Sequence, residues 1–283
     1  MPHRFERLGK CLFFWHTSSS GKILPLKKIP LDSVWKPPVD WAIQQYRMRF
    51  GSRLLSVYLR GSVAIGRSIA RTSDIDTVGI IRGSIAAKDK KTICDLESIP
   101  CPYEICPRVD FSILSETDMT TSARYRTGRL LAMVHGFPVW GKSFRKGLPY
   151  LSPGPEVAAY APRLQRDMKI YQSLLGCRDV DQPAIYRWIL KRIVRAAFET
   201  EMKDRNDFSL DTYTCGMVLL KHHPQFKDQL LGVLDYLLMN KPISKNEIRE
   251  FIDSVGYWAL GRIRSQGLDR EIVQLDRRIL REQ

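Results

Sequence analysis

Residues 54–62, Leu-Leu-Ser-Val-Tyr-Leu-Arg-Gly-Ser, and residues 73–76, Ser-Asp-Ile-Asp, are the two stretches that decide the fold. The first stretch begins as an apolar, β-rich run, and the β-branched run Ile75–Ile81 continues the second, so each predicts a strand. Between them, Gly61 and Gly66 permit backbone conformations with positive φ and the close approach of a ligand. The pattern therefore predicts two strands joined by a glycine-serine loop.

Three carboxylates are placed by this strand pattern. Alternate side chains of a strand share a face, so Asp74 and Asp76 point the same way while Ile75 points to the apolar side. Two like charges on one face repel each other unless a cation lies between them. Asp110 opens a third apolar strand, Val109–Leu114, where an acid is costly unless it is paired or functional. If these strands are neighbours, three carboxylates converge, as a two-metal phosphoryl-transfer site requires.

The loop before the carboxylates has the composition of a phosphate-binding segment. Successive exposed N–H groups in a glycine-rich turn form a concavity that suits a triphosphate. The hydroxyl of Ser62 is placed to donate to a terminal phosphate oxygen, and Arg60, Arg67 and Arg71 add positive charge nearby. Each feature alone is common, and their occurrence together is what makes the prediction specific.

Residues 59–66, Leu-Arg-Gly-Ser-Val-Ala-Ile-Gly, followed by Ser-Asp-Ile-Asp, resemble the signature of the DNA polymerase β-type nucleotidyltransferase superfamily. The likeness is greatest to minimal nucleotidyltransferases and aminoglycoside nucleotidyltransferases. The gap between the two halves is one residue longer than in common members, which we interpret as a loop insertion. Asp110 stands where the family has its later acid, and Gly136–Lys142 resembles the segment that follows. The resemblance covers residues 54–142.

The resemblance implies transfer of a nucleoside monophosphate from an NTP to an acceptor hydroxyl, with pyrophosphate leaving. Asp74 and Asp76 would hold two Mg²⁺ ions, with Mn²⁺ as the alternative ion, and Asp110 would bind one metal or act as the base. Positive side chains of the helical half often complete such a triphosphate site, although a solvated helix face is the simpler interpretation of those residues here. The expected nucleotide-binding residues, ATP being one candidate donor, are Gly61, Ser62, Arg60, Ser73, Lys191 and Arg195.

The predicted organisation is an α+β domain followed by an all-helical domain. We expect a nucleotidyltransferase-type mixed sheet with flanking helices in residues 1–150, of which residues 1–36 form an arm, and a helical bundle in residues 151–283. In the first part we expect a helix opened by Pro37-Pro38, a helix at 118–135 and an edge strand at 137–142. The helices expected in the second part are at 155–176, 183–203, 211–222, 225–239, 244–265 and 268–282.

Composition limits the class of protein and its partners. The 283 residues carry a net charge of +15, and no apolar run is long enough to span a membrane. The apolar patch Cys11–Trp15 is too short for a signal peptide, so we expect a cytoplasmic protein without a membrane partner. The six cysteines lack the spacing of a zinc site.

The acceptor is less determined than the reaction. The basic charge favours RNA, with a tRNA-like end as the first hypothesis, because phosphate neutralisation supplies most non-specific affinity. The second hypothesis is a small molecule of the aminoglycoside kind, which the net charge of +15 disfavours because such polycations need an acidic pocket. Asp204, Asp207 and Asp211 could form a local acidic cleft or could cap a helix. The third is a hydroxyl of a partner protein. A non-catalytic binding module is a fourth, and the three intact carboxylates argue against it.

Overall fold

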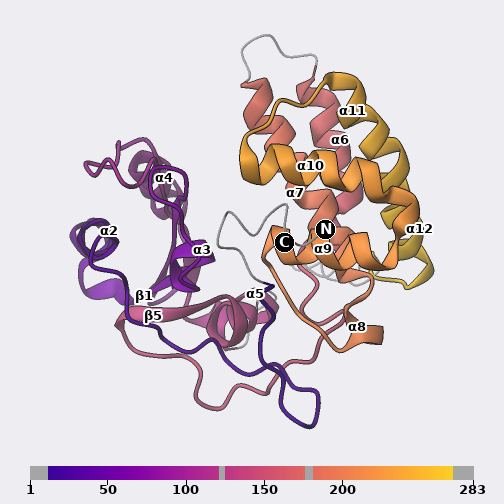
Figure 1. Cartoon of the computed structure of the whole chain (residues 1–283). Coiled ribbons are helices and arrows are strands. Elements are labelled where there is room, and N and C mark those ends of the chain that lie inside the picture. Colours follow the sequence, from indigo (N-terminus) through magenta and orange to yellow (C-terminus); the bar gives the residue numbers. More distant parts are fainter. Residues whose placement is uncertain (1–11, 121–124, 176–180, 270–283) are drawn as a thin grey trace. The chain divides into compact units, whose positions relative to one another are not determined.

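The computed structural model describes residues 12–120, 125–175 and 181–269, which form two compact units. One unit comprises residues 24–151 and contains the sheet, and the other comprises residues 152–269 together with residues 12–23 (Figure 1). The chain passes from the sheet-containing unit to the helical unit after Leu151. The arm differs from the expectation, since its residues 12–23 pack with the helices and not with the sheet.

A mixed five-stranded sheet organises the first unit. Its strands are β1 (Leu54–Arg60), β2 (Ile75–Ile81), β3 (Val109–Asp110), β4 (Ile113–Ser115) and β5 (Gly136–Gly141). The order is β3-β2-β1-β5, and β4 pairs with β2 beyond the end of β3. β1 runs antiparallel to both β2 and β5, whereas β3 and β4 run parallel to β2. The first two strands lie where the sequence predicted them, and β5 is the predicted edge strand.

The sheet is buried on both faces, which explains its nearly continuous apolar strands. Helix α2 (Lys36–Phe50) covers one face and packs against Val57, Leu59 and Ile75. Tyr58, Val78 and Ile80 point to the other face, where Met119 and Leu131 cover them. Helix α2 begins with prolines in its first turn and is followed by Gly51, as predicted. Since side chains alternate along a strand, Asp76 belongs to the same face as Val78 and Ile80.

The third predicted strand is broken in two, and Tyr46 of α2 explains the break. Instead of one strand over residues 109–114, β3 ends at Asp110 and β4 begins at Ile113. The hydroxyl of Tyr46 donates to the carbonyl of Ser112 at 2.8 Å and accepts from the amide of Ser112 at 3.0 Å. Gly79 of β2 leaves room for the tyrosine ring, because a Cβ there would lie 2.7 Å from the ring.

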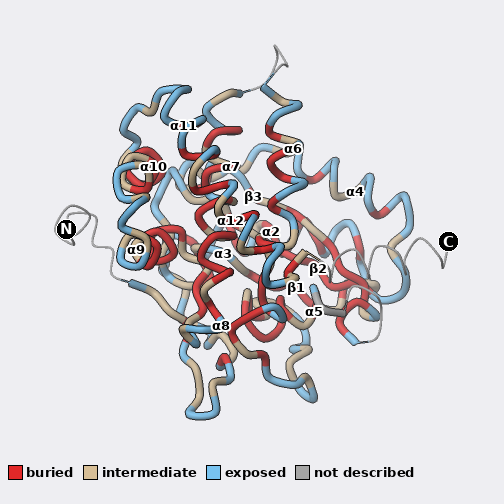
Figure 2. Tube along the Cα trace, turned by 90° about the vertical axis from the view of Figure 1, so that its right-hand side faces the viewer, coloured by how far each residue is buried: buried red, intermediate tan, exposed pale blue. Residues whose placement is uncertain are grey.

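Short helices surround the sheet. The segment at Gly61, predicted as loop, contains one helical turn, α3 (Gly61–Ala64). Helix α4 (Ala87–Glu97) follows β2 and is mostly exposed (Figure 2). The helix predicted over residues 118–135 is interrupted: 3-10 turn η2 (Thr117–Met119), helix α5 (Tyr125–Leu130) and π-turn η3 (Leu131–His135) are the parts described, and residues 121–124 lie outside the described chain.

The second unit is helical, with α7 buried along much of its length (Figure 2). The segment predicted as helical from residue 155 becomes so only at Ala161, because Glu199 of α7 accepts the backbone N–H groups of Ala159, Tyr160 and Ala161 and holds them in an irregular turn. The helix expected at 268–282 lies almost entirely outside the described residues. The elements are η4 (Ala161–Arg163), α6 (Leu164–Leu174), α7 (Gln182–Glu199), α8 (Met202–Arg205), α9 (Thr212–His222), η5 (Pro224–Phe226), α10 (Lys227–Met239), α11 (Lys245–Phe251), η6 (Ile252–Gly256) and α12 (Tyr257–Ser265).

Among the helices described, none combines the length and the apolar character that crossing a membrane demands. Asp211 caps α9 by accepting from the amide of Thr214 at 2.9 Å, which is the alternative to an acidic cleft that the sequence left open for this residue. Asp207 pairs with Arg205 at 3.0 Å.

Candidate active site

Strand pairing brings the predicted carboxylates together at one end of the sheet. Asp76 of β2 lies in register with Asp110 of β3 on one side and with Arg60 of β1 on the other. Asp74 precedes Asp76 by two residues, so the two share a face, and Ile75 between them is fully buried. The side chains of Asp74, Asp76 and Asp110 are 39%, 30% and 33% exposed, so all three are open to a ligand.

Gly61 lies directly against Asp76. Its φ is +73°, and a Cβ at this position would stand 2.1 Å from Oδ2 of Asp76, which is far inside contact distance. A glycine is therefore required here for two reasons, the left-handed backbone and the space that the carboxylate occupies. This contact joins the glycine-serine segment to the aspartate motif.

Two arginines neutralise the carboxylates. Nη2 of Arg60 lies 3.6 Å from Oδ1 of Asp76. Arg108 bridges the other two, with Nε 2.7 Å from Oδ1 of Asp110 and Nη2 3.6 Å from Oδ2 of Asp74. The sequence analysis missed Arg108, although its position two residues before Asp110 gives the signal, because alternate residues of an extended chain share a face.

A cavity of about 270 Å³ opens beside this row of charges. Its lining combines two guanidiniums with two carboxylates, one of them Glu97 at the end of α4, which the sequence analysis did not consider. A hollow of mixed charge suits a polar, charged ligand better than an apolar one. The lining residues are Arg60, Glu97, Arg108, Asp110, Phe111 and Ser112.

The carboxylates fit a divalent metal ion in their chemistry. Carboxylate oxygens are the hard donors that Mg²⁺ takes, and Asp74, Asp76 and Asp110 would supply them. These side chains do not form a complete coordination site, however: within the described ranges no group of three or more His, Cys, Asp or Glu side chains is placed to hold a metal ion. The guanidiniums of Arg60 and Arg108 stand among the carboxylates instead.

The two serines of the motif are bound into the loop. The hydroxyl of Ser73 accepts from the amide of Ile69 at 2.8 Å, which closes the turn before β2. The carbonyl of Ser62 accepts from the amide of Arg67 at 2.8 Å, and the Ser62 side chain is half-buried. These bonds shape the loop, and the expected roles of both serines toward a nucleotide remain predictions.

Lys191 and Arg195 lie on α7 in the helical unit. Lys191 is exposed. Arg195 is not part of a solvated face, because its Nη1 donates to the hydroxyl of Tyr160 at 3.0 Å and its Nε is buried. Arg192 stacks over the same tyrosine ring, at 5.0 Å from its centre. The assignment of Lys191 and Arg195 to nucleotide binding therefore stays a prediction, and Arg195 has a structural partner of its own.

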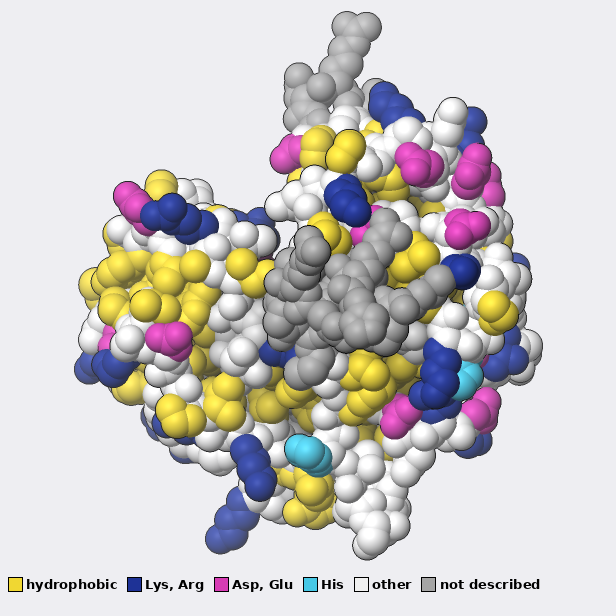
Figure 3. Space-filling view, in the orientation of Figure 1, with side chains coloured by type: hydrophobic (Ala, Val, Ile, Leu, Met, Phe, Trp, Pro, Cys, Tyr) yellow, Lys and Arg dark blue, Asp and Glu magenta, His cyan; other side chains and the backbone are white. Residues whose placement is uncertain are grey.

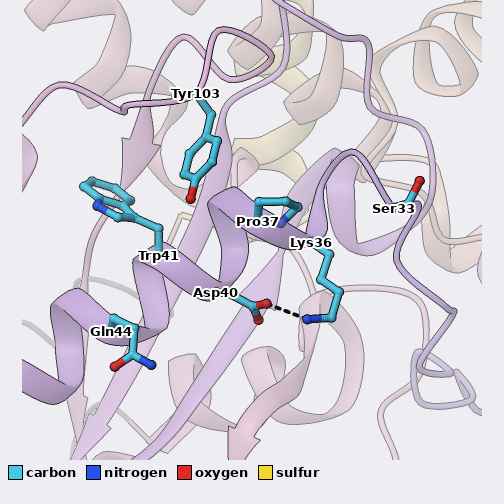
Figure 4. A pocket seen from close by; sticks show the side chains of 7 residues that line it. All are labelled: Ser33, Lys36, Pro37, Asp40, Trp41, Gln44 and Tyr103. Atoms are coloured by element: carbon cyan, nitrogen blue, oxygen red, sulfur yellow. Dashed lines mark hydrogen bonds and ion pairs between the residues drawn. The ribbon is translucent and has the colours of Figure 1, made fainter.

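A larger hollow of about 510 Å³ lies on α2, and none of the three carboxylates lines it (Figure 4). Trp41 and Tyr103 form its aromatic walls, and the ion pair between Lys36 and Asp40 lies at its edge. Hydrophobic side chains gather on this side of the sheet unit (Figure 3). The lining of this hollow is mainly apolar, and its two charged groups, Lys36 and Asp40, are paired with each other at 2.6 Å.

Comparison with known proteins identifies the fold. No protein-family model matches the sequence, and no curated protein matches it at a significant level. Among solved structures, this chain is similar to "spectinomycin adenyltransferase AAD(9) from Enterococcus faecialis with ATP and spectinomycin". The two share 12% sequence identity with a TM-score of 0.55, over 81% of this chain and 99% of the other. The chain thus shares the fold of that structure, an α+β part with a mixed sheet followed by a helical region, which confirms the predicted fold class.

Proposed function

We propose that this protein is a nucleotidyltransferase that transfers a nucleoside monophosphate from an NTP, with ATP as the first candidate, to a hydroxyl of a small molecule. The observation that carries the proposal is the row of Asp74, Asp76 and Asp110 beside a glycine that leaves room for Asp76, on the fold of an adenyltransferase. A surface strand that carries two aspartates by chance would need neither the register partner Asp110 nor a residue without a side chain at position 61.

The proposed reaction is an in-line displacement at the α-phosphorus. The acceptor oxygen forms a bond to that phosphorus, the bond to the bridging oxygen of pyrophosphate breaks, and the acceptor proton passes to a base, for which Asp110 is the candidate. Asp74 and Asp76 would hold Mg²⁺ or Mn²⁺ with Asp110, and the bound ions would neutralise charge on the phosphates. Arg60 adds a fixed positive charge next to Asp76.

The acceptor favoured here differs from the one that charge alone favours. RNA was the first hypothesis because of the net charge of +15, but that charge is distributed over the whole chain. The similar structure holds ATP with spectinomycin, a small molecule, and this supports the small-molecule hypothesis. We assign the 270 Å³ cavity to the donor phosphates, because the guanidiniums of Arg60 and Arg108 line it. Modification of a partner protein is the remaining alternative.

The test incubates the protein with each NTP, Mg²⁺ and a panel of aminocyclitols and aminoglycosides, spectinomycin included. We expect pyrophosphate release that depends on the acceptor and a product heavier by one nucleotide residue in mass spectrometry. Asp76→Asn should lower kcat/KM by at least about 100-fold, the scale seen when one charge-stabilising group is removed. Its circular dichroism should stay unchanged, because Asp76 is partly exposed. Wild-type rates in Asp76→Asn would refute the mechanism.

Parallel incubations with total RNA and with a cell extract distinguish the acceptors. Label that enters RNA would replace the small-molecule proposal with the tRNA-like one, and label that enters a protein band would favour protein nucleotidylation. The absence of transfer from every NTP to every acceptor class would favour a binding module.

A further inference from the structure

Arg108 has two features that the chemistry proposed above does not use. Its backbone is held firmly, since its carbonyl accepts from the amide of Ile75 at 3.0 Å and from the thiol of Cys106 at 2.9 Å. Its side chain is 62% exposed, although the guanidinium contacts both Asp74 and Asp110. A fixed backbone with an exposed, charged end describes a side chain that can leave its partners without disturbing the strand.

The contacts of Arg108 are also the contacts that a divalent ion would need. Asp74 and Asp110 belong to different segments, and Arg108 is the residue that bridges them. Without a cation these carboxylates and Asp76 would repel one another. The guanidinium removes that repulsion, yet an ion cannot take the same oxygens while the guanidinium keeps them. Exposed ion pairs are weak, so the exchange of one cation for the other is cheap.

The displaced guanidinium of Arg108 could contact a ligand in the cavity that this residue lines. Arg108 and Arg60 both line the 270 Å³ hollow beside the carboxylates, where the donor nucleotide would lie under the proposed function. Arginine presents several N–H donors in a fork that matches phosphate oxygens, which makes it suited to this second partner. Arg60 is less free to move, since its Nε is buried.

We propose that Arg108 is a positioning residue that holds Asp74 and Asp110 together before the divalent ion binds, and that its guanidinium turns to the donor phosphates when the ion takes these carboxylates. The inference rests on the proposed function, which supplies the ion and the nucleotide. It assigns Arg108 two successive partners and makes it a competitor of the ion.

The experiment measures two affinities of the full chain and of Arg108→Gln. Mn²⁺ binding without nucleotide is followed by electron paramagnetic resonance, and binding of α,β-methylene-ATP at saturating Mn²⁺ by calorimetry. We expect Arg108→Gln to bind Mn²⁺ roughly 3- to 10-fold more tightly, because the competing ion pairs are gone. It should bind the nucleotide analogue roughly 10-fold more weakly, because one charged phosphate contact is lost. Opposite changes in the two affinities cannot arise from a damaged fold, which would weaken both.

Two further variants complete the design. Arg49→Gln removes one exposed positive charge from α2 and should leave both affinities unchanged, which controls for net charge. Arg108→Lys keeps the charge without the fork, so its Mn²⁺ affinity should lie between those of the wild type and Arg108→Gln.

Mn²⁺ affinity that is unchanged or weaker in Arg108→Gln overturns the inference, as does nucleotide affinity equal to that of the wild type. Failure of the proposed function has a different signature: no nucleotide transfer occurs with any donor, whatever the Mn²⁺ affinity of Arg108→Gln. Normal transfer by the wild type with an unshifted Mn²⁺ affinity would retain the function and reject the role of Arg108.

Discussion

At the scale of single residues, Gly61 shows how the motif depends on space as well as on charge. We expect Gly61→Ala to lower kcat/KM by about 100-fold, the cost of displacing a reacting group by about 1 Å, because the new Cβ and Oδ2 of Asp76 cannot share their positions. The left-handed backbone should also lower the free energy of unfolding by about 1–2 kcal/mol. Steady-state kinetics and urea denaturation measure the two effects.

Gly83 supplies the matched control for Gly61. Its φ of +75° is nearly the same, but a Cβ there would meet nothing within 4 Å. Gly83→Ala should therefore lose a similar amount of stability and keep its activity. Equal activity losses in the two variants would show that backbone strain, and not the position of Asp76, explains the result for Gly61.

At the scale of elements, Tyr46 joins helix α2 to two strands. Tyr46→Phe removes the acceptor of the Ser112 amide and the donor to the Ser112 carbonyl. Because the groups left behind are buried or half-buried, we expect the free energy of unfolding to fall by about 1–3 kcal/mol. Amide exchange of β3 and β4 should accelerate, since these strands meet at Ser112. Unchanged protection of both strands would contradict the explanation given for the break between them.

Tyr46 also predicts how stability depends on pH. Burial raises the pKa of Tyr46 to about 12, above its ordinary value near 10. Between these two values the unfolded chain loses a proton that the folded chain keeps, so the stabilisation is complete below pH 10 and decreases as the pH rises toward 12. The decrease due to this residue should amount to about 2–3 kcal/mol. Urea denaturation at pH 8 to 11.5 should show a shallower decline in Tyr46→Phe than in the wild type, and parallel curves would contradict the prediction.

In the helical unit, Glu199 holds an irregular turn against helix α7. Its buried carboxylate accepts three backbone N–H groups, from Ala159 at 2.8 Å, Tyr160 at 2.9 Å and Ala161 at 2.6 Å. Glu199→Ala leaves these donors without their acceptor, and we expect a loss of about 3 kcal/mol in the free energy of unfolding, measured with urea. Glu199→Gln retains one oxygen acceptor and should lose less. A smaller loss in the alanine variant than in the glutamine variant would contradict this role.

At the scale of the whole molecule, the chain passes from one unit to the other twice, after Ile23 and after Leu151. The chain leaves the helical unit after Ile23 and re-enters it at Ser152. These two points are joined by a hydrogen bond, in which Nζ of Lys22 donates to Oγ of Ser152 at 3.0 Å. The arm before the first passage is anchored by Trp15, whose amide donates to the carbonyl of Phe208 and whose ring packs edge-on against that of Phe208. Residues 12–23 of the arm are thus a structural part of the helical unit.

Trp15→Ala tests this assignment of the arm. Removal of a buried tryptophan should lower stability by about 3–5 kcal/mol. Hydrogen exchange should show the loss in α7 and α9, with β1 and β2 unaffected, because the sheet has its own core. Increased exchange in the strands alone would instead place the arm with the sheet, as the sequence analysis expected.

Prediction from sequence succeeded where neighbouring residues decide the structure. Two strands, the helix opened by prolines and the edge strand all follow from periodicity and from proline or glycine stereochemistry. The resemblance of residues 54–142 to a known superfamily predicted the fold that the comparison confirms. Asp110 was predicted as a site residue because an acid in an apolar strand is costly unless it is functional. The register of Asp110 with Asp76 is a long-range contact that sequence periodicity does not show.

The sequence by itself thus determined strands β1, β2 and β5 and the helix opened by prolines, because a backbone period of two residues and the stereochemistry of proline and glycine act locally. Only the tertiary structure decided that Arg108 bridges Asp74 and Asp110, that Tyr46 divides the third strand, and that residues 12–23 belong to the helical unit. Each of these depends on side chains or segments that meet across distant parts of the chain, as Tyr46 and Ser112 do over 66 residues. The free energy of such contacts comes from packing and pairing between distant segments, so a pattern of neighbouring residues does not predict them.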